Sequence, residues 1–92
     1  MKYVKVKWMH TSADYPVLLY SELTADRWEL RKVELYADGR MGFADREEQS
    51  GSTELGIEPL PPLEQIAADP EFEPAIISAE EFESVWARAK AR

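Results

Sequence analysis

The sequence contains no cysteine and a single histidine, His10. Without cysteine the chain can form no disulfide, no thiolate zinc site and no cysteine nucleophile. One histidine is also too few for a usual zinc site, which needs three or four convergent protein ligands. The absence of cysteine fits a reducing compartment. We therefore expect a cytoplasmic protein that binds no metal or cofactor.

Long apolar runs are missing as well. The longest, from Pro16 to Tyr20, is far shorter than the roughly 20 residues that span a bilayer. The first residues alternate charged and apolar side chains, so they lack the continuous apolar stretch of a signal peptide. We therefore expect neither a membrane segment nor a targeting segment.

Basic residues are absent from much of the second half. Residues 1–46 hold eight Lys or Arg and seven Asp or Glu, a net charge of +1, whereas residues 47–92 hold three and eleven, a net charge of −8. No Lys or Arg lies between Glu47 and Glu83. A nucleic-acid-binding protein would instead cluster basic residues to displace counterions from phosphates. The charge distribution argues against nucleic-acid binding.

What the chain does contain is enough apolar material for one core. It has 92 residues, of which 45% are hydrophobic and 11% aromatic. A chain of this length forms one domain, here residues 1–92. Alternating apolar and polar residues predict a strand over 2–10, a second over 17–22, and a hairpin over 27–44.

The hairpin is the feature around which we expect the fold to be organised. Asp38-Gly39 is predicted to form a two-residue turn with positive φ. The apolar residues of its first strand change parity between Leu30 and Val33. We interpret this change as a β-bulge near Arg31-Lys32. The alternative is a strand that is buried on both faces.

The remaining residues predict a mobile loop over 46–53, a short helix and a longer one. The short helix runs from Pro62 to Ala68 and is expected to bury Leu63, Ile66 and Ala67. Residues 71–77 are predicted to be irregular or extended. Ser78 begins a capping box with Glu81, and the helix over 79–90 repeats apolar residues at helical spacing.

Strands followed by helices, without strand–helix alternation, predict an α+β fold. We expect an antiparallel sheet of about four strands, followed by a short helix and a C-terminal helix packed on one face. The alternative is a strongly bent, barrel-like sheet with the helices at one end.

No residues predict a reaction. His10 with Asp14 could act as a general base, but a lone histidine at a strand end is more often a surface residue. Two nearby carboxylates could act as a paired acid and base. Residues 47–92 hold eleven Asp or Glu, so such pairs arise by chance and their spacing does not indicate a catalytic site. Trp8, Trp28 and Trp86 fall at core positions, and we predict one packed cluster of the three rather than a ligand cage.

The acidic segment is the feature that could bind a partner. Its candidate binding residues are Glu47, Glu48, Glu54, Glu58, Asp69, Glu71 and Glu73. One interpretation is a solvated face that keeps the protein soluble. The other is a surface that docks a basic protein, in which charge raises the association rate and buried aromatic residues provide affinity.

Several stretches resemble a family of short bacterial proteins known only as a domain of unknown function. They are YVKVKWMH, YSEL, RWELRKVELYADGRMGFAD and ISAEEFESVW, and the resemblance extends from Lys2 to Trp86. The hairpin stretch is its most specific part, with Arg27, Glu29, Arg31, Lys32, Asp38 and Gly39. The resemblance implies no catalytic residues.

Small acidic bacterial proteins of this type are often immunity proteins that neutralise a toxin. We therefore expect a non-enzymatic protein-binding module, an immunity-type inhibitor of a basic bacterial toxin domain. The alternative is a small accessory or ligand-binding domain, and, less favoured, a small enzyme that uses His10 and the hairpin charges.

Overall fold

The computed structural model describes residues 1–91. The strands are β1 (Lys2–Trp8), β2 (Leu18–Leu23), β3 (Glu29–Leu35), β4 (Met41–Ala44) and β5 (Phe72–Ile76), and the helices are α1 (Leu63–Ala67) and α2 (Ala79–Lys90). In this part of the chain the strands form one antiparallel sheet in the order β4-β3-β2-β1-β5. The predicted α+β fold is confirmed, with five strands rather than about four. No helix in residues 1–91 is long and apolar enough to cross a membrane.

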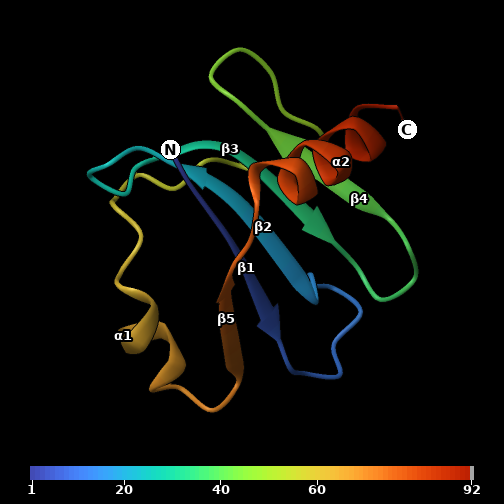
Figure 1. Cartoon of the computed structure of the whole chain (residues 1–92). Coiled ribbons are helices and arrows are strands. Elements are labelled where there is room, and N and C mark those ends of the chain that lie inside the picture. The colour runs from blue at the N-terminus through green and yellow to red at the C-terminus, as the bar shows by residue number, and fades with distance from the viewer. Residues whose placement is uncertain (92) are drawn as a thin grey trace.

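The two helices lie toward opposite edges of the sheet, as Figure 1 shows. Helix α2 packs across the sheet and contacts β1 to β4, whereas α1 contacts β5. One sheet face, which we call the α2 face, packs against α2 through Tyr20, Val33 and the buried ring of Phe82. The other face carries Val4, Val6 and Leu19, because side chains alternate along each strand.

Helix α2 begins and ends where the sequence predicts. The Ser78 hydroxyl accepts a hydrogen bond from the Glu81 amide, which is the first half of the predicted capping box. The Glu81 carboxylate lies 3.4 Å from Lys5 Nζ, so this side chain pairs with β1. Arg88 and Lys90 occupy the last turn and complement the helix dipole. The last basic residue of the sequence, Arg92, lies outside the described residues.

Strand β5 occupies the stretch that was predicted to be irregular or extended. Ile77 donates to the Tyr3 carbonyl and Met9 donates to the Glu71 carbonyl, which brackets the pairing with β1. Since hydrogen-bonding direction alternates along an antiparallel strand, Pro74 faces the open edge, where its missing N–H breaks no ladder bond. The proline also blocks pairing with a foreign strand at this edge.

The β3–β4 turn differs from the prediction by one residue. Tyr36 donates to the Arg40 carbonyl, and Gly39 donates to the Tyr36 carbonyl. The loop therefore has three residues, Ala37, Asp38 and Gly39, and of these Gly39 alone has positive φ, at +94°. A two-residue turn of type I′ would need positive φ at both central positions, so the predicted two-residue turn is wrong while the positive φ at Gly39 is confirmed.

The predicted β-bulge exists, but it lies one residue earlier. Glu22 pairs with Arg31 and Leu23 pairs with Glu29, which leaves Leu30 as the extra residue. Trp28 precedes this irregularity and is 44% exposed. The prediction of one tryptophan cluster is therefore wrong. Trp86 packs against Phe43 and Phe82 on the α2 face, and Trp8 belongs to a separate aromatic group described below.

The segment from Arg46 to Thr53 is anchored rather than the mobile loop predicted. Asp45 accepts hydrogen bonds from the amides of Glu47 and Glu48, and Ser50 exchanges hydrogen bonds with the Phe43 backbone at the outer edge of β4. Thr53 is 1% exposed, and its hydroxyl donates to Glu34. These contacts cover the β4 edge.

Candidate functional site

A cavity of about 380 Å³ lies between α1 and the sheet face opposite α2. Its apolar walls come from the sheet and from the segment that leads into α1. They are lined by Val6, Leu19, Leu60, Pro61, Ile66 and Phe72, and the polar lining residues are Ser21, Glu29, Lys32, Gln65 and Asp69. We call this space the α1 cavity.

The cavity exists because α1 covers the sheet incompletely. The sequence predicted that α1 would bury Leu63, Ile66 and Ala67, but no residue of this five-residue helix is buried. Pro61 and Pro62 hold the approach extended, and Pro70 ends the helix after little more than one turn. The apolar sheet face beneath α1 is therefore left partly uncovered.

The polar floor of the cavity is internally bonded. The Glu29 side chain is 5% exposed. One of its carboxylate oxygens accepts from the Ser21 hydroxyl at 2.9 Å, and the other accepts from the Gly56 amide at 2.5 Å. Lys32 Nζ lies 3.0 Å from this second oxygen. Because both oxygens of Glu29 are engaged, the carboxylate fixes the 54–61 segment on the sheet and is poorly placed to act as a base.

The rim of the cavity is acidic. Asp69 lines the cavity and accepts a hydrogen bond from the Glu71 amide. The Glu71 carboxylate accepts from the Trp8 indole at 3.2 Å. The Trp8 ring packs against Phe72 and Tyr15, with centroids 5.6 and 5.4 Å apart, and Phe72 also lines the cavity. Aromatic surface and carboxylates therefore meet at one corner of the molecule.

The predicted partner-binding residues do not form one surface. Glu47 and Glu48 follow β4, whereas Asp69, Glu71 and Glu73 lie beside or within β5. These strands are the two edges of the sheet, four strand spacings or about 19 Å apart. Glu54 and Glu58 lie in the connection between β4 and α1 and are exposed.

The two acidic groups also differ in how they are neutralised. Glu48 forms an ion pair with Lys90 of α2, so it is neutralised by a basic residue distant in sequence although no Lys or Arg lies between Glu47 and Glu83. Within residues 1–91, Asp69, Glu71 and Glu73 form no ion pair, although Lys7 lies opposite Glu73 on β1. The group at β5 is therefore the less neutralised of the two.

His10 has no free ring nitrogen. Nε2 lies 2.8 Å from the Pro16 carbonyl, and Nδ1 accepts from the Ser12 amide at 3.1 Å. This pattern requires the neutral ring to carry its proton on Nε2, which donates to the carbonyl. His10 thus holds the connection between β1 and β2 together. Within residues 1–91, no group of three or more His, Asp or Glu side chains is placed to hold a metal ion.

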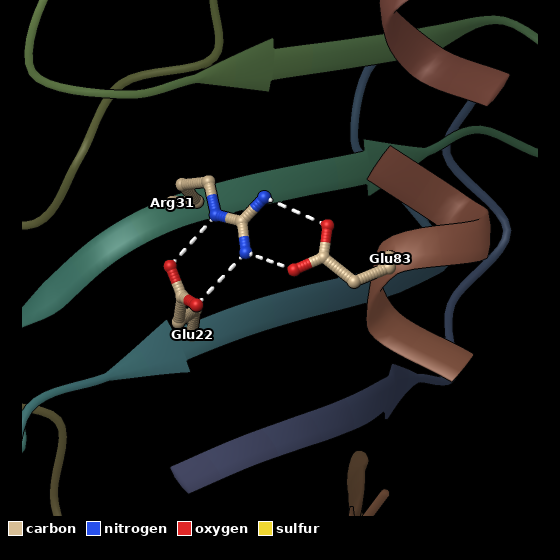
Figure 2. Close-up of polar contacts among 3 residues, drawn as sticks. All are labelled: Glu22, Arg31 and Glu83. Atoms are coloured by element: carbon tan, nitrogen blue, oxygen red, sulfur yellow. Dashed lines mark hydrogen bonds and ion pairs between the residues drawn. The ribbon is translucent and has the colours of Figure 1, made fainter. Parts of the chain in front are cut away.

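The largest ionic network lies beneath α2 and was not predicted. Figure 2 shows Arg31 between Glu22 of β2 and Glu83 of α2. Arg31 donates twice to Glu22, at 2.7 and 2.8 Å, and its guanidinium lies over the rings of Phe82 and Trp86. The hydrogen bonds from Arg31 hold the pKa of Glu22 and of Glu83 below the usual 4.5. Arg31 donates two hydrogen bonds to each of the two carboxylates, and the network joins the helix to the sheet.

A family model described as a domain of unknown function, DUF6881, matches residues 2–91. The chain belongs to this family. The match covers nearly the whole chain and extends past Trp86, the end of the resemblance expected from the sequence. Neither the curated proteins nor the solved structures gave a significant match.

Proposed function

We propose that this member of the DUF6881 family is a non-enzymatic module that binds a basic protein, as an immunity-type inhibitor of a basic bacterial toxin domain. The observation that carries the proposal is the corner where the α1 cavity meets Asp69 and Glu71. There an apolar surface lies beside carboxylates that form no ion pair within residues 1–91.

The charges elsewhere support this choice of surface. On the α2 face charged side chains pair with one another within the protein. Arg31 binds Glu22 and Glu83, and Lys5 binds Glu81. Residues 47–87 contain no Lys or Arg. A cationic partner would therefore be drawn to the α1 side, with apolar contacts providing affinity once it has docked. The proposal includes a cytoplasmic site of action, which the lack of cysteine supports.

Co-expression with each neighbouring gene tests the immunity role. We expect one neighbour to encode a basic protein that stops growth when expressed alone. Co-expression of this protein should restore growth, and the two chains should co-purify as a complex. Neighbouring products that are harmless, or that remain toxic and unbound in its presence, would contradict the immunity role.

A second candidate function is a small ligand-binding domain. The volume of the α1 cavity lies within the range of about 300–1,000 Å³ that is usual for ligand pockets. Native mass spectrometry of the purified protein separates the two functions. A tightly bound small molecule would favour the ligand-binding domain, whereas a mass equal to that of the chain alone would favour the protein-binding module.

A further inference from the structure

We infer that the α1 cavity receives one large apolar side chain of the basic partner, and that a neighbouring Lys or Arg of the same segment lies against Asp69 and Glu71. This inference rests on the proposed function and assigns it a docking point. The occupant is thus a basic protein segment with an apolar anchor, as distinct from a small metabolite or a second copy of this chain.

The lining of the cavity requires the buried part of the occupant to be apolar. Val6, Leu19 and Ile66 form its walls, and Ile66 belongs to a helix that buries none of its own residues. Both oxygens of the Glu29 carboxylate already have partners, in Ser21, Gly56 and Lys32, so the floor has no unpartnered carboxylate oxygen for a polar head group. Burial of an aliphatic or aromatic side chain would remove this apolar surface from water, which is favourable.

The rim requires the adjacent residue of the occupant to be basic. Asp69 lies on the cavity lining, and Glu71 is fixed beside it by the Trp8 indole. The aromatic group formed by Trp8, Tyr15 and Phe72 continues from the cavity wall, and Tyr15 is 54% exposed. A Lys or Arg placed here would meet carboxylate oxygens and the faces of aromatic rings, and both attract a cation.

The same charges disfavour a second copy as the occupant. The chain has a formal net charge of −7, and the rim carries part of that charge. Two acidic rims brought together would repel each other. A basic segment would instead neutralise Asp69 and Glu71 on docking.

A displayed library of random peptides provides a defined probe of this site. The library is selected on the immobilised full chain, and the affinities of the selected peptides are measured for four variants. Gln65→Trp fills the cavity from an exposed position on α1, and Ala67→Trp places the same side chain on the same helix at a position that does not line the cavity. Asp69→Asn/Glu71→Gln removes the rim charge, and Glu80→Gln removes an exposed charge from α2.

We expect the selected peptides to carry Lys or Arg beside one large apolar residue. Gln65→Trp should weaken their binding about tenfold or more, as loss of an anchor pocket does. The rim double variant should weaken binding by a smaller factor, about threefold. Ala67→Trp and Glu80→Gln should bind like the wild type, and thermal melting confirms that each variant is folded.

Three outcomes would contradict the inference, and one of them would also contradict the proposed function. Basic peptides or a basic partner that bind Gln65→Trp and wild type equally would remove the docking point but leave the proposed function standing. Selection of acidic or uncharged peptides, or of none, would count against both. A concentration-dependent dimer of the wild type that Gln65→Trp dissociates would assign the cavity to a second copy and contradict the inference.

Discussion

At the scale of single residues, Arg31 connects two strands and a helix through its hydrogen bonds. It lies on β3, binds Glu22 on β2 and Glu83 on α2, and covers the rings of Phe82 and Trp86. The Glu22 side chain is 10% exposed, so water cannot replace Arg31 easily. The buried Glu22 carboxylate is stable as long as Arg31 compensates its charge, and removal of Arg31 leaves that charge uncompensated.

Arg31→Met tests this role. The substitution leaves Glu22 buried without its cation, and we expect the free energy of unfolding to fall by about 3 kcal/mol. Urea denaturation measures the loss. Arg88→Met is the control, because Arg88 is exposed on α2 and its replacement should change stability little. Equal stability of the two variants would show that the network beneath α2 is dispensable.

The same network predicts how stability depends on pH. The pKa values of Glu22 and Glu83 are lowered in the folded protein, since Arg31 donates hydrogen bonds to both carboxylates. Their contribution to stability is therefore complete above the unfolded pKa of 4.5 and is lost as the pH falls through the folded values. Unfolding free energies measured over this acidic range should decline in the wild type and decline less in Arg31→Met. Parallel pH profiles would contradict the assignment.

At the scale of elements, local sequence predicted much of the structure because local chemistry specifies it. Ser78 and an apolar stripe define α2, and alternation defines β1 and β2. Strand β5 was harder to predict, since Pro74 argues against a strand unless its position faces an open edge. The bulge was predicted one residue too late, near Arg31-Lys32 instead of Leu30. A change in the alternation of apolar residues shows that a residue is inserted, but it does not show which one.

The β3–β4 turn provides a prediction at this scale. Gly39 has φ of +94°, and a Cβ placed there would contact nothing within 4 Å. The cost of Gly39→Val should therefore come from backbone strain alone, about 1 kcal/mol or more. Thermal or urea unfolding measures it, and Gly39→Asn should cost less because Asn tolerates positive φ better. A Val variant as stable as the wild type would show that the turn can relax without cost.

At the scale of the whole molecule, composition showed that the charge is unequal along the chain but not how it is distributed in space. A contiguous acidic segment suggested one surface, yet the sheet order sends its two ends to opposite edges. The cavity was also beyond prediction from sequence, because it arises from what α1 fails to bury. Long-range pairing, such as Glu48 with Lys90, decides which acids remain unneutralised.

Docking of a basic protein on the α1 side can be tested directly, because the acidic residues lie at two separate edges of the sheet. Asp69→Asn/Glu71→Gln and Glu47→Gln/Glu48→Gln each remove two negative charges, beside the β5 edge at the cavity rim and after the β4 edge respectively. The basic partner is the one identified by co-expression. Its rate of association is measured with the wild type and with each variant across a salt series.

We predict that the β5-edge variant associates about threefold more slowly at low salt, in line with the expected effect of the rim charges on binding. The β4-edge variant should remain close to the wild type, and all three rates should converge near 1 M salt, where the Debye length is about 3 Å. Rates that do not depend on salt, or a larger effect of the β4-edge variant, would contradict docking on the α1 side.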